Sequence, residues 1–163
     1  MDEPIVVMGI CGSYDLDSAN GRMLELILRE CRSIGAETVV WDHGKRPLPL
    51  VGAEGSWDDS NVKDFQEMAV SADAYVLSSP EYHGTMSGVM KNSLDWLYSK
   101  HTKGKVFALV STLGASSFLA SSSVATGAKF SSVTVSGFTS TSIPIFFLIF
   151  SAILADLPVL SLR

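Results

Sequence analysis

Short apolar runs alternate with segments of helical periodicity along the first two thirds of the chain, and few folds accommodate that order. Ile5–Ile10 is a continuous run rich in β-branched residues, which is typical of a strand buried on both faces. Similar runs predict strands at residues 37–41, 74–77 and 106–110. Apolar residues at helical spacing predict helices from near Asn20, from about Ser60 and over Ser87–Tyr98.

Strands that alternate with helices in this way predict an α/β fold, with a central parallel sheet covered by helices on both faces. The length of 163 residues and the hydrophobic share of 47 % suit one compact domain over residues 1–163.

Charge and cysteine content argue against several classes of partner. A net charge of −5 without a basic stripe argues against nucleic acid. Cys11 and Cys31 have neither the number nor the spacing of a disulfide framework or a zinc site, which favours a cytoplasmic protein. The acidic start of the chain predicts no signal peptide.

We expect ligands at three loops, because open parallel sheets bind ligands beyond the carboxyl ends of their strands. These loops are residues 11–19, 78–85 and 111–117. The first leads into a helix N-terminus, where backbone N–H groups favour an anion and Ser13, Ser18 and Asn20 can add donors. An ordinary helix cap is the alternative. The loop matches neither the P-loop motif nor the glycine motif of dinucleotide-binding folds.

The second loop and the helix after it carry the most specific pattern in the chain. Residues 79–84 read Ser-Pro-Glu-Tyr-His-Gly, and residues 87–96 read Ser-Gly-Val-Met-Lys-Asn-Ser-Leu-Asp-Trp. This segment resembles the hallmark of the NADPH-dependent FMN reductases and their quinone, azo and chromate reductase relatives. The resemblance covers roughly residues 4–114, including the proline-rich segment Arg46–Leu50.

The resemblance implies a flavodoxin-like three-layer sandwich that binds FMN at these loops. By position, the resemblance implies that the phosphate of FMN is held by Ser13, Ser18, Ala19 and Asn20. It implies that the isoalloxazine ring lies against Pro80, Glu81, Tyr82, His83 and Gly84. At the rim of the ring it implies Ser111, Thr112 and Gly114. Gly84 also permits the close backbone approach that a flat ring needs.

The implied activity is electron transfer from NADPH or NADH, through FMN, to a small-molecule acceptor such as a flavin, quinone, azo compound or oxyanion. The flavin carries the chemistry, so no side chain need act as an obligate acid or base. The resemblance also implies a homodimer or homotetramer. Trp96 is expected in the core or at a dimer interface, and Lys91, Asn92 and Asp95 could serve only to order the helix.

The first loop departs from the family pattern at Asp15, where an arginine is usual. An acid near a phosphate is repulsive, and together with the atypical C-terminal third this motivates an alternative, a non-catalytic or degenerate flavodoxin-like domain. A flavodoxin-like electron carrier is a third possibility.

The composition changes after Ser111. Lys129, Asp156 and Arg163 are the only charged residues beyond that point, and half of the 32 positions from 111 to 142 are Ser or Thr. A poor helix over residues 117–130 and a strand at 133–135 are the elements we expect there.

The origin of this atypical segment, residues 115–163, is open. Translation from a shifted frame or an unspliced intron would explain the abrupt change. A membrane anchor is the rival, because residues 143–162 are about long enough to span a bilayer. Asp156 and Pro158 interrupt that run and no basic cluster flanks it, so we do not expect a span.

Overall fold

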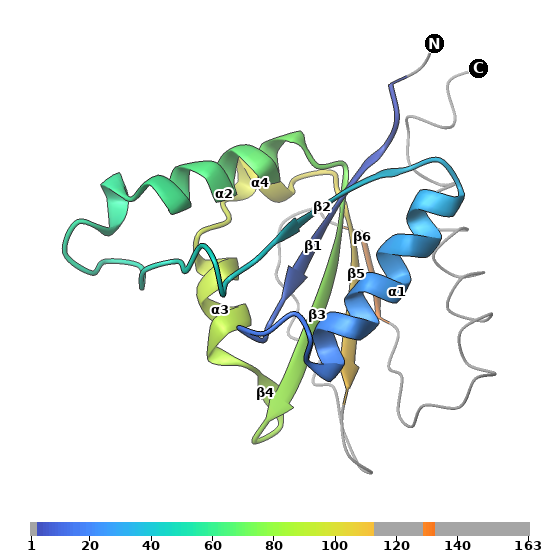
Figure 1. Cartoon of the computed structure of the whole chain (residues 1–163). Coiled ribbons are helices and arrows are strands. Elements are labelled where there is room, and N and C mark those ends of the chain that lie inside the picture. The colour runs from blue at the N-terminus through green and yellow to red at the C-terminus, as the bar shows by residue number, and fades with distance from the viewer. Residues whose placement is uncertain (1–2, 113–128, 133–163) are drawn as a thin grey trace.

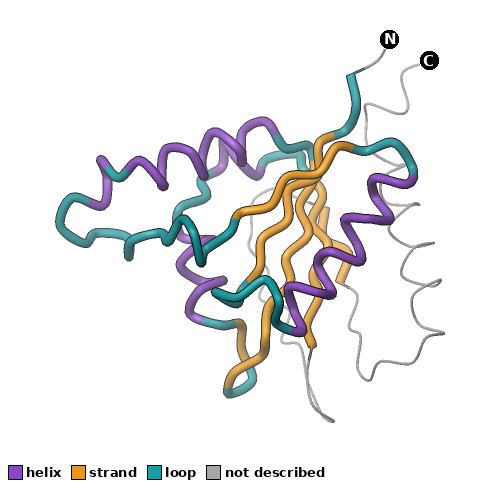
Figure 2. Tube along the Cα trace, in the orientation of Figure 1, coloured by secondary structure: helices purple, strands orange, loops and turns teal. Residues whose placement is uncertain are grey.

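The computed structural model describes residues 3–112 and 129–132, which form a sheet between two layers of helices (Figures 1 and 2). In chain order the elements are β1 (Val6–Cys11), α1 (Ala19–Ser33), β2 (Glu37–Trp41), a 3-10 turn (Ser56–Asp58), α2 (Ser60–Ser71), β3 (Ala74–Tyr82), β4 (Thr85–Met86), α3 (Gly88–Asp95), α4 (Ser99–Thr102), β5 (Val106–Thr112) and β6 (Lys129–Ser132).

The sheet has the strand order β2-β1-β3-β5-β6, and these neighbours all pair in parallel. Only the short strand β4 is antiparallel, and it pairs with the end of β3. This arrangement confirms the predicted α/β class with a central parallel sheet and helices on both faces.

Alternate residues of each strand point to opposite faces of the sheet, and each face has its own apolar core. On β1, Val7 belongs to the core under α1, whereas Met8 belongs to the core under α2 and α3. One face of α1 carries five apolar residues at helical spacing, and each of them is buried: Met23, Leu24, Ile27, Leu28 and Cys31. The helix ends at Ser33, and Gly35, at φ 94°, follows its C-cap residue Ile34.

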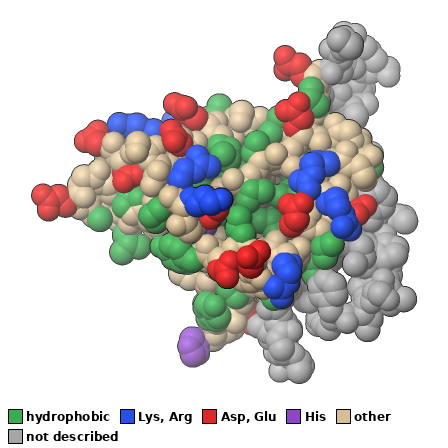
Figure 3. Space-filling view, in the orientation of Figure 1, with side chains coloured by type: hydrophobic (Ala, Val, Ile, Leu, Met, Phe, Trp, Pro, Cys, Tyr) green, Lys and Arg blue, Asp and Glu red, His purple; other side chains and the backbone are tan. Residues whose placement is uncertain are grey.

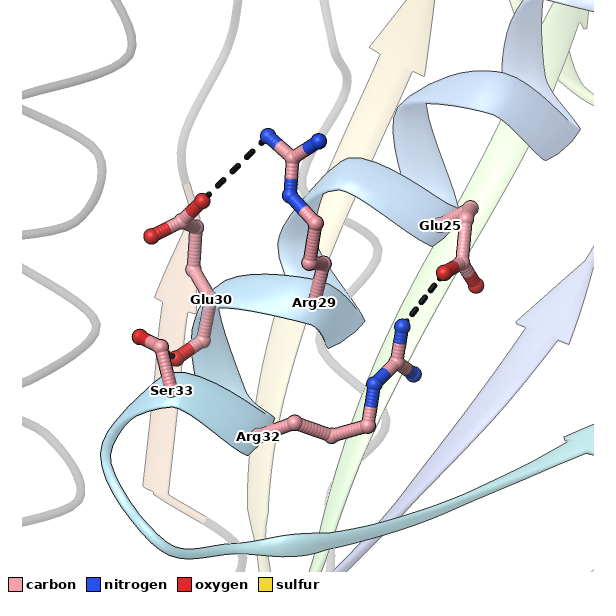
Figure 4. A network of polar contacts seen from close by, with 5 residues as sticks. All are labelled: Glu25, Arg29, Glu30, Arg32 and Ser33. Carbon is pink, nitrogen blue, oxygen red and sulfur yellow. Dashed lines mark hydrogen bonds and ion pairs between the residues drawn. The ribbon is translucent and has the colours of Figure 1, made fainter.

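The outer face of α1 carries ion pairs rather than core contacts (Figure 4). Arg32 pairs with Glu25, and Arg29 with Glu30 at 3.4 Å. Arg32 also donates to Thr38 Oγ1 at 2.8 Å, which joins the helix to the edge strand β2. Exposed pairs of this kind contribute about 0–1 kcal/mol each, so the buried face of α1 dominates its stability.

Two elements differ from the sequence-based prediction. The third strand was predicted to end at Leu77, but β3 continues to Tyr82 because Ser78–Pro80 pair with residues 110–112 of β5. The third helix was predicted over Ser87–Tyr98, but α3 ends at Asp95, and the short α4 begins only at Ser99.

The strand β6 lies where a helix over residues 117–130 had been predicted, so that prediction is wrong at residues 129–130. Its sequence, Lys-Phe-Ser-Ser, has only one strongly apolar residue, yet Lys129–Ser132 pair with Val106–Leu109 of β5. The predicted strand at 133–135, the rest of the predicted helix and the apolar run from Ile143 lie outside the described residues.

Candidate functional site

The carboxyl ends of β1, β3 and β5 lie at one edge of the sheet, which is the lower edge in Figure 1. The β1–α1 loop, the β3–β4 hairpin and the start of α3 meet there. The sequence predicted the first two of these as ligand-binding segments, and the structure brings them together.

Gly12 joins the first loop to the second. Its N–H donates to Ser78 O at 2.7 Å, and Ser87 Oγ donates to its carbonyl at 2.6 Å. A Cβ on Gly12 would lie 2.7 Å from Ser79 Oγ and 2.8 Å from Ser87 Oγ. The loop after β1 therefore passes so close to β3 and α3 that only glycine fits at this position.

The remainder of the first loop is shaped by its own side chains. Asp15 Oδ1 accepts from the N–H of Asp17 at 2.8 Å, and the carbonyl of Asp15 accepts from Ser18 at 3.2 Å. Ser18 then caps α1, since its Oγ accepts from Gly21 N at 3.1 Å. The loop thus delivers the chain into α1 through a side-chain turn and a serine cap, as the cap alternative proposed.

Ser13 and Ser18 converge on the thiol of Cys11 at the floor of this loop. Burial raises the pKa of that thiol, the hydrogen bonds from Ser13 and Ser18 oppose the shift, and the charge of Asp15 adds to it. Two of the predicted phosphate ligands therefore lie around one point, near the positive end of α1.

Ala19 and Asn20 form the first turn of α1. Asn20 is buried, and its backbone carbonyl accepts from Ser78 Oγ at 2.9 Å. It holds the start of α1 against β3. A contact between Asn20 and a phosphate stays a prediction.

The second loop is a tight β-hairpin instead of an irregular loop. Glu81 pairs with Met86 and Tyr82 with Thr85, so only His83 and Gly84 lie between the two strands. Both have positive φ, 54° and 79°, which is the signature of a type I′ turn. Tyr82 and His83 are exposed at this tip, and Pro80 is buried below it.

Two buried oxygen atoms at this edge have no hydrogen-bond partner within the described part of the chain: Glu81 Oε2 and Ser111 Oγ. Ser111 is the second-last residue of β5 and pairs with Ser79 of β3, so it lies at the same edge as the hairpin. An unpaired buried polar group costs about 1–3 kcal/mol. A ligand with donors along its edge could satisfy both.

The predicted rim residues are only partly described. Ser111 and Thr112 belong to β5 instead of the predicted loop, and Gly114 lies outside the described residues.

The motif residues of α3 hold the segment that follows β2. Asn92 Nδ2 donates to Leu48 O and Pro49 O, both at 3.1 Å, and Trp96 Nε1 donates to Pro49 O at 2.9 Å. Trp96 is completely buried, which confirms its core alternative. Lys91 and Asp95 pair with each other on the surface. This part of the motif therefore organises the scaffold.

His43 links the end of β2 to the same helix. Its Nε2 lies 3.0 Å from Ser93 Oγ, and that hydroxyl donates to Val89 O at 2.8 Å, so the imidazole is the donor to Ser93. Burial lowers the pKa of His43 to about 4, despite the opposing charge of Asp42. Reasoning from the sequence did not select His43, Gly12 or Ser87, although Ser87 lies within the recognised motif.

Other kinds of site find little support. Within residues 3–112 and 129–132 no three His, Cys, Asp or Glu side chains are grouped to hold a metal ion. No helix in this part of the chain is long and apolar enough to cross a membrane. Cys11 and Cys31 are both buried free thiols.

Comparison with known proteins gives one family. A model of the NADPH-dependent FMN reductases matches residues 5–134, which includes β6. An FMN-dependent NADPH-azoreductase from Staphylococcus haemolyticus is 32 % identical over 110 residues, or 64 % of this chain and 58 % of the relative. The chain therefore spans somewhat over half the length of this curated relative.

Solved structures agree on the fold. An azoreductase from Bacillus anthracis superposes with a TM-score of 0.61 over 93 % of this chain and 99 % of its own, at 16 % identity. The flavoenzyme FerB, an NAD(P)H:(acceptor) oxidoreductase from Paracoccus denitrificans, superposes with a TM-score of 0.57 at 25 % identity, over 67 % of this chain and 61 % of its own.

Proposed function

The chain belongs to the NADPH-dependent FMN reductase family, and we propose that it binds FMN at the edge formed by the β1–α1 loop, the β3–β4 hairpin and the end of β5. The observation that carries this proposal is the junction of these segments through Gly12, beside two buried oxygens that have no partner among the described residues. The bound flavin would accept a hydride from NAD(P)H and pass electrons to a small acceptor.

The phosphate of FMN would lie at the N-terminus of α1. Ser13 and Ser18 lie together there, and the first backbone N–H groups of a helix attract an anion. Ser18 Oγ accepts from Gly21, and its hydroxyl, which faces the Cys11 thiol, would turn its hydrogen toward a phosphate oxygen when FMN binds. Ala19 and Asn20 would contribute through the first turn of the helix.

The isoalloxazine ring would lie against the hairpin, along Pro80–Gly84. The flavin has an N–H group on its pyrimidine ring, and within residues 3–112 and 129–132 the buried oxygens of Glu81 and Ser111 meet no donor, so the residues present fit the group. The exposed rings of Tyr82 and His83 would offer flat surfaces beside it. Thr112 and Gly114 would complete the rim.

The acceptor class that we favour is an azo compound or a quinone, because the curated relative named above is an NADPH-azoreductase. NADPH and NADH both remain donors to test. If donor and acceptor use one site in turn, the kinetics are ping-pong.

We also propose a cytoplasmic homodimer or homotetramer. Leu50 and Trp57 are exposed by 70 % and 59 %, and both lie in the segment that joins β2 to α2. Figure 3 shows apolar side chains gathered near this segment, with acidic and basic side chains interspersed around them and over the rest of the same face. An apolar surface of this kind is suited to contact with a second subunit.

The test is titration of the purified, flavin-free protein with FMN, followed by flavin absorbance and fluorescence, and then by NADPH and NADH oxidation with and without a quinone or azo acceptor. Stoichiometric binding and acceptor-dependent oxidation support the proposal. A folded protein that binds no FMN would indicate the non-catalytic alternative. Binding without oxidation of either nucleotide would indicate an electron carrier.

A further inference from the structure

The rim of the β1–α1 loop carries an unusual set of charges for a loop that receives a phosphate. Between Ser13 and Arg22 the charged residues are Asp15, Asp17 and Arg22, and all three are exposed. Two negative charges at this place oppose a dianionic phosphate, and one positive charge favours it. The geometry of these side chains indicates why the acids are tolerated.

Asp15 has a structural role within the loop. Its Oδ1 accepts from Asp17 N at 2.8 Å, and its carbonyl accepts from Ser18 N at 3.2 Å, so the residue closes the turn from both its side chain and its backbone. This turn leads into the Ser18 cap of α1. The hydrogen bond to Asp17 needs an oxygen acceptor, and an amide oxygen supplies one as well as a carboxylate does.

The charge of Asp15 nevertheless reaches the floor of the loop. It adds to the effect of burial in raising the pKa of the Cys11 thiol, which lies beside Ser13 and Ser18. Any anion held by Ser13 and Ser18 would therefore experience the same repulsion.

Arg22 is the cation placed to offset this repulsion. It lies on the first full turn of α1, and its Nη1 donates to the carbonyl of Asp17. This contact holds the guanidinium against the segment that carries both acids. The next arginine of the helix, Arg29, is two turns further along and pairs with Glu30, away from the loop.

We propose that Asp15 and Arg22 act as a matched pair in phosphate binding. Asp15 forms the turn that positions Ser13 and Ser18. Arg22 supplies a positive charge that offsets the repulsion between this acidic loop and a phosphate monoester. The inference rests on the proposed binding of FMN, and it adds Arg22 to the residues that determine the affinity.

The experiment compares FMN with riboflavin, which has the same ring and no phosphate. Dissociation constants for both are measured by flavin fluorescence, at low and moderate salt, for the full chain and its variants. Arg22→Gln should weaken FMN binding by about three- to tenfold and leave riboflavin unchanged, since charge effects near a surface have this size. Arg22→Lys should retain most of the affinity, and Arg29→Gln is the matched control on the same helix.

Two substitutions of Asp15 separate the effect of its charge from the effect of its hydrogen bond within the turn. Asp15→Asn keeps the acceptor for Asp17 and removes the charge, so FMN should bind about two- to fivefold more tightly. Asp15→Ala removes both and should bind FMN more weakly than Asp15→Asn. Added salt should weaken FMN binding less in Arg22→Gln than in the unaltered chain, or strengthen it, because the loop charges that remain, Asp15 and Asp17, both repel the phosphate.

The outcomes distinguish this inference from the proposed function. If the unaltered chain is folded and binds neither flavin, the proposed function fails and the inference fails with it. If the chain binds FMN but Arg22→Gln changes nothing, or weakens FMN and riboflavin equally, the inference alone is overturned. Equal affinities in Asp15→Asn and Asp15→Ala would overturn the role of the turn.

Discussion

Single residues decide how closely the first loop approaches its neighbours. Gly21 lies in the first turn of α1, where a Cβ would be 2.0 Å from the carbonyl oxygen of Leu16 and 2.5 Å from its carbon. Both are backbone atoms, so no side-chain rotation relieves the clash and the loop itself must move. The requirement for glycine here is therefore steric.

We expect Gly21→Ala to lower the free energy of unfolding by about 1–3 kcal/mol or more, because overpacking at a rigid contact has this cost. FMN affinity should fall as well, since the displaced loop carries Ser18. Gly88→Ala is the control: Gly88 begins α3 with no atom within 4 Å of its Cβ position, and alanine favours a helix. Urea unfolding of both variants measures the difference, and equal stabilities would contradict the steric account.

Buried histidines make stability depend on pH. Burial lowers the pKa of His43 to about 4 in the folded chain, whereas an unfolded histidine titrates near 6.5. As the pH falls below 6.5, His43 binds a proton in the unfolded chain but stays neutral in the folded chain. The free energy of unfolding therefore decreases until the pH reaches about 4. His101 is lowered to about 4 as well, by burial and by Lys100 and Lys105, and titrates in the same window.

We expect His43→Gln to flatten the pH dependence of unfolding between pH 6.5 and 4.5. One such histidine contributes at most about 1.4 kcal/mol per pH unit in this range. Glutamine retains an N–H for Ser93 Oγ and cannot be protonated. Chemical unfolding at several pH values measures the slope, and a variant as sensitive as the unaltered chain would show that His43 does not titrate in this window.

Sequence patterns predicted most of the residues at this edge, but not how they are held. Ser13 and Ser18 lie together because a strand and a helix follow each other across a short loop, which is local information. The contact of Gly12 with Ser78 and Ser87 joins segments more than sixty residues apart. A single sequence contains no periodicity that reports such a contact, so Gly12 and Ser87 were missed.

At the scale of elements, the β3–β4 hairpin is the feature that positions the proposed ring contact. Its two turn residues have positive φ, and Gly84 at 79° occupies a conformation that other residues adopt only with strain. The sequence predicted a loop over residues 78–85, and proline is rare inside strands. Pro80 is accommodated near the end of β3, where pairing passes from β5 to β4.

We expect Gly84→Val to destabilise the fold by about 1–3 kcal/mol through this backbone strain, and to weaken FMN binding more than tenfold, because the hairpin changes shape. Gly52→Val is the matched control. Gly52 has φ 83° and open space around it, but it lies in the segment between β2 and α2, away from the hairpin. Thermal unfolding should show similar losses for both variants, and only Gly84→Val should lose flavin affinity. Equal affinities would place the ring elsewhere.

The elements that the sequence missed are those with little apolar signal. Runs such as Ile5–Ile10 are buried on both faces and carry continuous apolar residues, so their strands are easy to predict. The edge strand β6 has the sequence Lys-Phe-Ser-Ser, and its identity as a strand comes from backbone pairing with β5. Composition alone favoured a poor helix there, because no local pattern records that pairing.

At the scale of the whole molecule, the question is whether β6 belongs to the cooperative fold. The family match ends at residue 134, just after this strand, and β6 covers the edge of β5, which carries Ser111 at its end. If the pairing supports the sheet, disruption of β6 should lower the affinity for FMN as well as the stability of the whole fold.

Proline tests this pairing without removing any of the chain. Neighbouring residues of a strand direct their N–H groups to opposite sides, so one of Phe130→Pro and Ser131→Pro must lose an N–H directed at β5. We expect that variant to lose on the order of 2 kcal/mol of stability and some FMN affinity. Phe130→Ala and Ser131→Ala control for the side chains. If both proline variants unfold at the same urea concentration as their alanine controls, β6 is not part of the cooperative unit, and the sheet from β2 to β5 is stable without it.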